Sequence, residues 1–296
     1  MLPKISRGAK SAPAPSVMTQ VSDHELKQFV KLIYDQAGIF VSPQKKTLLS
    51  NRLRRRLRQT GIESFGKYLK NLTRLQPNDP EWDAFLQEIT THETYLFRDD
   101  SQWNWFCKTY LPERIANKNA RRSLKIWSAA CSTGDEAYTI AACIANTIPE
   151  YEQWQISIIG TDIGVGSLKE AKAGVFGERA MRLAPKLYRL RYFTKSKDAE
   201  VWQAKPELKA MTSFRQHNLI HPLNDRNFDV VFLKNVLIYF NTESKKRVLD
   251  RVRSVIKPGG LLVTGAAEGV ADLVRDFKRI HPWLHQMPKK NGGGER

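Results

Sequence analysis

The stretch from Leu124 to Ala141 constrains the fold of this chain more than any other part of the sequence. It begins as a short apolar run, passes through a loop of very small residues that includes Ser132 and Gly134, and ends with apolar residues at helical spacing. Small side chains between a strand and a helix let the backbone approach a ligand closely. Apolar runs and helical segments alternate downstream, which is typical of a parallel sheet with helical crossovers. We therefore predict a doubly wound, Rossmann-like α/β domain over residues 122–288.

Polar side chains stand where the predicted strands of this domain end. Asp162 follows one apolar run, 26 residues after Glu136, and Asn235 follows another. The carboxyl ends of parallel strands meet at one edge of a sheet, where an acidic residue takes the ribose hydroxyls in nucleotide-binding folds. Two structural alternatives stay open: a capping box from Thr133 to Glu136, and a cap for the next helix made by Asp162 or by Ser167. The loop has a single glycine, so the dinucleotide fingerprint is absent.

Later elements of the domain are predicted from helix breakers and apolar runs. A helix over Thr242–Ile256 is expected to end at a turn from Lys257 to Gly260, because proline and glycine interrupt helices. The last clear strand is Leu261–Thr264. The polar segment 194–215 has no firm helical period and is predicted to contain short strands.

The part before residue 93 has helical apolar spacing throughout, which predicts an all-helical domain over residues 21–92 and a linker with a helix over 93–121. Ser22 and Glu25 form a capping box at its start. One helix is unusually basic, with arginines at five positions: Arg52, Arg54, Arg55, Arg56 and Arg58. No acidic residue lies four positions away along the helix to pair with them, which favours a docking face for an anionic partner over an ordinary solvated face.

The composition limits the partners. The net charge of +18 indicates an acidic partner, whether nucleic acid, anionic membrane or acidic protein. Three scattered cysteines are too few for a disulfide framework or a zinc site, and we predict no metal and a reducing, cytoplasmic location. No apolar run reaches the roughly 18 residues of a membrane span, so no membrane insertion is expected. Residues 1–20 are predicted to be a disordered basic tail, and residues 289–296 a flexible one.

Several stretches resemble the CheR-type chemoreceptor glutamate O-methyltransferases, in the order of that family, from about Leu26 to Gly265. They are Ala37–Ile39 with Lys46 and Arg52–Arg56, Glu93–Arg98, Trp127–Tyr138, Gly160–Ile163, Gly174–Phe176 with Arg191–Phe193, and Phe232–Phe240. The most specific are Ser132–Glu136 and Asp229–Phe240. The resemblance implies a small helical domain, then a methyltransferase fold with a small antiparallel β insertion, for which 194–215 is the expected place.

The resemblance also implies S-adenosyl-L-methionine as the cofactor and S-adenosyl-L-homocysteine as its product. Glu136 would hold the methionine amino group and Asp162 the ribose, with Asn218 and Leu219 beside the adenine. Thr94 and Arg98 would reach the methionine end, near Asn235 and Val236. The implied cofactor-binding set is His92, Thr94, Arg98, Glu136, Asp162, Asn218, Leu219, Asn235 and Val236, and the implied catalytic residues are Arg98 and Tyr239.

The chain departs from the family pattern at a few positions. His92 stands where the family usually has asparagine, Lys234 where it has arginine, and Gly164 where it has a polar residue. Segment 194–215 lacks a glycine pair associated with members that bind a receptor's C-terminal tether, which favours a tether-independent enzyme.

A methyl transfer of this kind needs few catalytic groups. A sulfonium methyl is already activated, and a glutamate carboxylate with a reference pKa of about 4.3 is ionised at neutral pH, so no general base is required. We expect a monomer acting on acidic cytoplasmic helices of chemoreceptors, docked by Arg52, Arg55 and Arg58. Two other functions stay open. One is a nucleic-acid methyltransferase, although an Asn/Asp-Pro-Pro-Tyr motif is absent, and the other is a non-catalytic, cofactor-binding scaffold on receptors.

Overall fold

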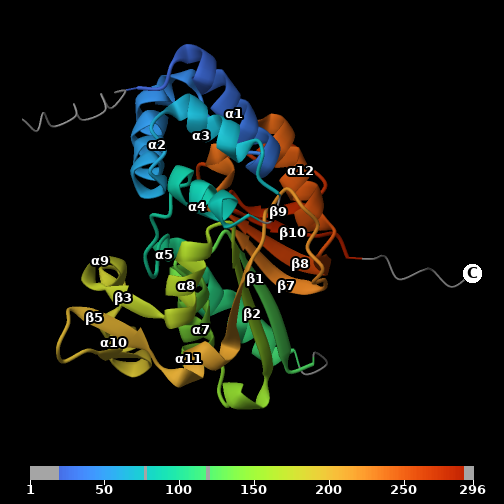
Figure 1. The fold of residues 1–296 in the computed structure, drawn as a ribbon. Helices are drawn as coiled ribbons and strands as arrows, with labels where there is room; N and C mark the ends of the chain where they lie inside the picture. Colours follow the sequence, from blue (N-terminus) through green and yellow to red (C-terminus); the bar gives the residue numbers. More distant parts are fainter. Residues whose placement is uncertain (1–19, 77–78, 118–120, 290–296) are drawn as a thin grey trace, which may run out of the picture.

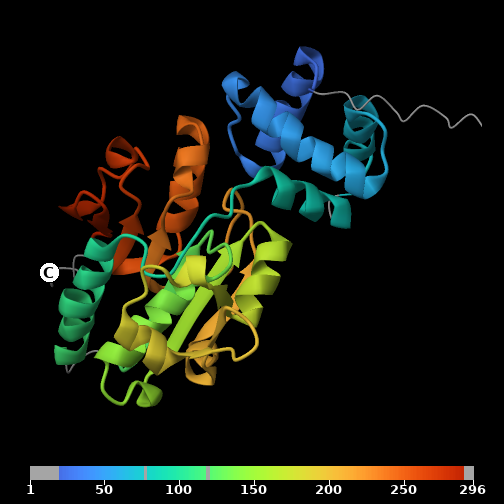
Figure 2. The same cartoon turned by 90° about the vertical axis from the view of Figure 1, so that its left-hand side faces the viewer.

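A computed structural model describes residues 20–76, 79–117 and 121–289, which form a helical domain followed by an α/β domain (Figures 1 and 2). The predicted tails lie outside the described residues, apart from Gln20 and Lys289. No helix in the described part of the chain is long and apolar enough to cross a membrane.

The helical domain contains α1 (Asp23–Ala37), α2 (Lys46–Thr60), α3 (Phe65–Leu72) and α4 (Pro80–Ile89). The predicted capping box is present, because the Ser22 hydroxyl accepts from the backbone of Glu25 while the Glu25 carboxylate accepts from that of Ser22. The core is aromatic: the ring centroids of Phe29, Tyr68 and Phe85 lie 6.2 to 6.4 Å from one another. The prediction of an all-helical N-terminal domain is confirmed.

A linker connects the two domains through α5 (Asp100–Trp105), one π-helical turn and α6 (Leu111–Ala116). Seven strands then form a mixed sheet in the order β6-β2-β1-β7-β8-β10-β9. The parallel strands are β1 (Ser123–Ala129), β2 (Gln155–Asp162), β6 (Thr212–Gln216), β7 (Phe228–Leu233) and β8 (Ile256–Thr264). The antiparallel edge consists of β9 (Lys278–His281) and β10 (Leu284–Gln286).

Both faces of this sheet are covered, as a parallel sheet requires. Alternate residues of β7 point to opposite sides: Val230 and Phe232 join one core with α7 (Asp135–Thr147) and α11 (Pro206–Met211), while Val231 and Leu233 join the other with α12 (Thr242–Arg253). The chain leaves β1 first toward β2 and later toward β7, so the strand order reverses there. Ligands of open α/β sheets bind at such a reversal, beyond the carboxyl ends of the strands.

The small antiparallel insertion is present, but its bounds differ from segment 194–215. Its three strands, in the order β3-β5-β4, are β3 (Val175–Gly177), β4 (Phe193–Lys195) and β5 (Val201–Ala204), with α9 (Glu178–Met181) and α10 (Lys186–Tyr192) between them. The sheet begins before residue 194 because Phe176 pairs with Trp202 across the strands. The last part of the segment belongs to the main sheet instead, since β6 pairs with β2.

Two predictions near the C-terminus are wrong. The helix expected over Thr242–Ile256 ends at Arg253, and the segment expected to be a turn, Lys257–Gly260, lies within β8. The glycines permit this: Gly259 has φ +75°, and a Cβ on Gly260 would lie 2.9 Å from the carbonyl oxygen of Phe228. Leu261–Thr264 is not the last strand, because β10 and the exposed β9 follow it.

Candidate functional site

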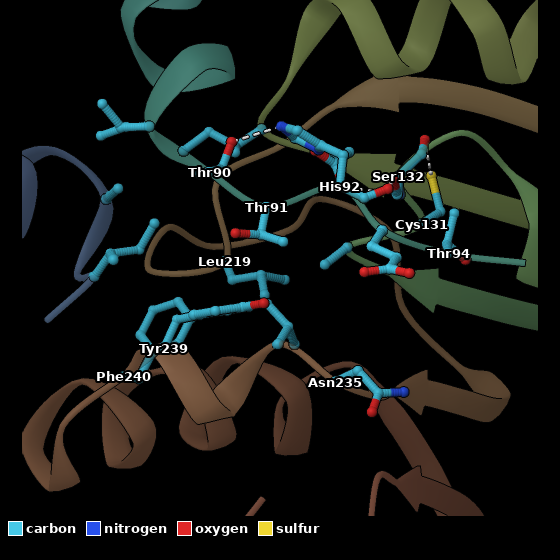
Figure 3. A pocket seen from close by; sticks show the side chains of 18 of the residues that line it. Thr90, Thr91, His92, Thr94, Cys131, Ser132, Leu219, Asn235, Tyr239 and Phe240 are labelled. Carbon is cyan, nitrogen blue, oxygen red and sulfur yellow. Dashed lines mark hydrogen bonds and ion pairs between the residues drawn. The ribbon is translucent and has the colours of Figure 1, made fainter. Parts of the chain in front are cut away.

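A deep pocket lies between the helical domain and the carboxyl ends of β1, β2 and β7 (Figure 3). It encloses about 1430 Å³ of empty space, its open mouth included. All the predicted cofactor-binding and catalytic residues line it: His92, Thr94, Arg98, Glu136, Asp162, Asn218, Leu219, Asn235, Val236 and Tyr239. Of the predicted docking residues only Arg52 lines it, whereas Arg55 and Arg58 do not.

Asp162 is buried at the end of β2, where its carboxylate organises the loop after β1. One oxygen accepts from the backbone of Ser132 and the other from that of Gly164, both at 2.8 Å. Ser132 has φ +50°, a strained conformation for a residue with a side chain, and the hydrogen bond to Asp162 helps to hold it. Each carboxylate oxygen has a second acceptor position, so the group can also take hydroxyl donors from a ligand.

Neither capping alternative is present in the structure. α7 begins after Gly134, whose φ is +88°, and the Thr133 hydroxyl donates to Asp135 rather than capping Glu136. α8 (Val165–Ala173) begins after Gly164 and has no side-chain cap from Asp162 or Ser167. The carboxylates of Glu136 and Asp162 therefore lie at the pocket wall for reasons other than helix capping.

Glu136 faces the pocket in an electrostatic setting that the sequence did not reveal. Its carboxylate accepts from the Ser128 hydroxyl at 2.8 Å and lies 3.6 Å from the Lys234 ammonium. Burial raises the pKa of Glu136, while Lys234 and Ser128 oppose that rise.

Lys234 is the functional residue that sequence reasoning treated only as a departure. Its side chain is 2% exposed, and its ammonium lies 3.1 Å from the Asp99 carboxylate and 4.9 Å from the centroid of the Trp103 ring. Two carboxylates, Asp99 and Glu136, thus share one ammonium. If both are ionised, the cluster has one excess negative charge, which suits a ligand ammonium. The signal available in the sequence was the position of Lys234, directly beside Asn235 at a strand end.

His92 and Gly164, two departures from the family pattern, fit each other sterically. The His92 ring bonds the Thr90 hydroxyl at 2.6 Å, and its Nδ1 lies 3.8 Å from the Asp162 carboxylate. A Cβ on Gly164 would lie 2.8 Å from His92 Cε1 and still closer to the side-chain oxygen of Gln87. A glycine at position 164 therefore leaves the space that the histidine and Gln87 occupy.

Other lining residues come from both domains. The Asn218 amide donates to the Gln36 carbonyl of α1 at 2.7 Å, so this predicted adenine neighbour also ties the domains together. Figure 3 shows His92 and Ser132 on one side of the pocket and Asn235, Tyr239 and Phe240 on the other. Burial lowers the pKa of His217, a further lining residue, to about 4, so its imidazole is neutral at pH 7.

The arginines of the basic helix α2 have more partners than predicted, because residues of α4 and of the segment after it bind them. The spacing within α2 could not show these partners. Arg52 turns back and donates to the Ile89 carbonyl and, at 2.8 Å, to the Thr91 hydroxyl. Arg55 pairs with Glu88 and Arg56 with Glu81. Arg58 is exposed and forms no ion pair within the described ranges.

Asp135, next to the pocket, gives a pH-dependent prediction. Burial raises its pKa to about 6, although the Thr133 hydroxyl opposes the rise. The folded state therefore holds this proton more tightly than the unfolded state, and the free energy of unfolding falls as pH rises from about 4 to about 6. Asp135→Asn should remove this loss, so that urea denaturation shows the variant gaining on wild type by up to about 3 kcal/mol across that range. Parallel pH profiles would contradict this.

Comparison with known proteins shows similarity along nearly the whole described chain. The family model for the CheR methyltransferase SAM-binding domain matches residues 92–283, and that for the CheR methyltransferase all-alpha domain matches residues 24–90. The chain is 33% identical over 261 residues to a chemotaxis protein methyltransferase of Klebsiella aerogenes, covering 87% of each protein. It is 32% identical over 283 residues to the protein of that description from Salmonella typhimurium, covering 92% of this chain and 94% of the relative.

Proposed function

This chain belongs to the CheR methyltransferase family, and from that premise we propose that it esterifies glutamate side chains of chemoreceptors. Membership makes it an S-adenosylmethionine-dependent methyltransferase of chemotaxis. The glutamate substrate is the further step. The observation that carries the proposal is one pocket that combines two kinds of site. Asp162 and the Glu136–Lys234–Asp99 cluster suit the cofactor, while Arg98 and Tyr239 suit an acidic acceptor.

The pocket residues fit the chemistry of the cofactor. Asp162 would accept from two ribose hydroxyls, and the carboxylates of Glu136 and Asp99 around Lys234 would attract the methionine ammonium. Leu219 and Val236 offer apolar surface to the adenine and the methionine chain. When bound, S-adenosylmethionine supplies a methyl group on a positively charged sulfur.

Such a reaction asks the protein mainly for alignment. With the cofactor bound, the incoming glutamate oxygen would form a bond to the methyl carbon as the carbon–sulfur bond breaks, and the bonding pair would stay on sulfur. Arg98, whose guanidinium lies 5.5 Å from the centroid of the Tyr95 ring, attracts the substrate carboxylate, and the Tyr239 hydroxyl orients it. Because the acceptor carboxylate is already ionised at neutral pH, the reaction requires no proton transfer to the protein.

Membranes containing chemoreceptors test the substrate. Incubation with methyl-labelled S-adenosylmethionine should label the receptor, and mild base should release the label as methanol, because a methyl ester hydrolyses under those conditions. Label that enters RNA instead would indicate a nucleic-acid methyltransferase. Cofactor binding without transfer would indicate a scaffold. A receptor whose acceptor glutamates are replaced by alanine is the control.

Docking along α2 gives a second prediction. Arg52 lines the pocket, and Arg55 and Arg58 follow it at intervals of three residues, which winds a strip of arginines around the helix. An acidic receptor helix placed on this strip would bring its glutamates to the pocket. Arg58→Glu should raise the KM for receptor about fivefold at low salt and leave the Kd of S-adenosylhomocysteine unchanged. Arg251→Glu, a charge reversal at an exposed position of α12, is the control, and equal effects of both changes would contradict docking on α2.

A further inference from the structure

Glu268 is a buried carboxylate that the proposed reaction does not use. It follows β8 and is 1% exposed. Among the ion pairs of residues 20–76, 79–117 and 121–289, none includes its carboxylate. The nearby Lys245 ammonium donates to the Glu268 backbone carbonyl at 2.7 Å, not to its side chain. A buried carboxylate without a cation is costly unless hydrogen-bond donors surround it.

The donors around Glu268 belong to the backbone after β7. Its Oε1 accepts from the N–H of Val236 at 3.2 Å. Burial raises the pKa of Glu268, while the backbone N–H groups of residues 235 to 238 oppose that rise. The other carboxylate oxygen, Oε2, is buried and has no hydrogen-bond partner within the described residues. The carboxylate thus lies at the start of the short helical turn Leu237–Tyr239, where backbone N–H groups lack partners within the turn.

Gly265 makes this approach possible. A Cβ at that position would lie 2.8 Å from Glu268 Oε1 and 3.1 Å from the backbone nitrogen of Asn235. Both distances are shorter than normal contacts, so a side chain at 265 would separate the carboxylate from the segment it holds.

The segment held in this way is part of the cofactor pocket. Asn235, Val236 and Tyr239 all line the pocket, and Asn235 has φ +58°, a conformation that needs support from its surroundings. The same segment also meets the helical domain, because the Phe40 N–H donates to the Tyr239 carbonyl at 2.8 Å.

We propose that Glu268 is a positioning residue, whose carboxylate fixes residues 235–239 in the geometry that the cofactor and the acceptor glutamate require. The inference rests on the proposed function for its catalytic consequence only. The part that concerns cofactor binding can be tested without any receptor. Glu268 does not line the pocket, and it acts through the backbone of Asn235 and Val236 and the position of Tyr239.

The test uses the full chain with Glu268→Ala, Glu268→Gln and Gly265→Ala. Calorimetry should show that Glu268→Ala weakens S-adenosylhomocysteine binding about tenfold, because the Val236 N–H loses its acceptor and the segment 235–239 loses its support. Glu268→Gln keeps one acceptor oxygen and should recover part of the loss. Gly265→Ala should reproduce the effect of Glu268→Ala. In hydrogen exchange, the amides of residues 236–238 should lose most protection in Glu268→Ala and Gly265→Ala, and less in Glu268→Gln. A general loss of stability would not be confined to this segment.

Asp229→Asn is the matched control. Asp229 is also a buried carboxylate, but it lies near the start of β7, where it accepts from the backbone of Lys125 at 2.8 Å. Its replacement should lower stability and leave cofactor affinity unchanged. The inference is overturned if folded Glu268→Gln and Gly265→Ala bind S-adenosylhomocysteine like wild type, or if Asp229→Asn weakens binding equally. Wild-type protein that binds S-adenosylhomocysteine but esterifies no receptor would refute the proposed substrate and leave the role of Glu268 standing.

Discussion

Lys234→Met should lower the free energy of unfolding by about 3 kcal/mol, since removing one partner of a buried ion pair leaves uncompensated charge. The ammonium lies between the carboxylates of Asp99, at 3.1 Å, and Glu136, at 3.6 Å, and only 2% of the Lys234 side chain is exposed. Without it, the two carboxylates repel each other in a site of low dielectric. For a chain of this size the change corresponds to a fall in Tm of about 5 °C.

The pH dependence of this loss identifies its cause. In Lys234→Met the two carboxylates should have raised pKa values in the folded state, so the destabilisation grows as pH rises and shrinks as they take up protons. Thermal unfolding at pH 5.5 and pH 8 measures the difference. Lys234→Arg keeps the positive charge and should unfold close to wild type. A methionine variant equally destabilised at both pH values would point to lost packing on Trp103 instead.

Asp162→Asn should weaken S-adenosylhomocysteine binding about 100-fold, the equivalent of roughly 3 kcal/mol. The carboxylate accepts from the backbone of Ser132 and of Gly164 and has acceptor positions left for ribose hydroxyls. An asparagine amide would direct N–H groups at one of those backbone donors and at the ribose. Hydrogen bonds to a charged acceptor are worth about 1.5 to 3 kcal/mol each, so two altered contacts account for the effect.

Isothermal titration of the folded variant measures this loss. Asp225→Asn is the control, because Asp225 is a carboxylate that pairs with Lys125 and Arg215 and does not line the pocket. Asp225→Asn should bind like wild type. If Asp162→Asn also binds within twofold of wild type, the ribose does not lie at Asp162, and the orientation of the cofactor in the pocket must be different.

The local pattern predicted the parts of the fold that depend on it. The capping box at Ser22 and the strand that ends on Asp162 follow from residues that are close in the sequence, a Ser-x-x-Glu spacing and a short apolar run. The extent of the β insertion did not, because β3 pairs with β5 across the whole of α9 and α10, and no sequence period shows such a pairing. The predicted strand Leu261–Thr264 is shorter than β8 for a similar reason. Pro258 and two glycines are typical of a turn, and only the pairing with β7 shows that they belong to a strand.

In the site, the sequence identified residues at strand ends and missed those whose role depends on tertiary contacts. The guanidiniums of Arg55 and Arg56 seemed free along α2, yet Glu88 and Glu81 reach them from α4. Lys234 and Glu268 look like ordinary charged residues until their burial is seen. His92 and Gly164 seemed to be two separate departures, and only the structure shows that the glycine leaves room for the histidine ring.

The contacts between the two domains determine whether either domain can be separated or replaced. Ile39 bridges to Phe240, the Phe40 N–H donates to the Tyr239 carbonyl, and Asn218 donates to Gln36, so the helical domain completes a wall of the pocket. The α/β domain alone would therefore have an incomplete pocket. A chimaera that takes its helical domain from a relative would acquire the receptor preference of that relative and keep an intact pocket only if residues 36–41 and 218–240 came from the same protein.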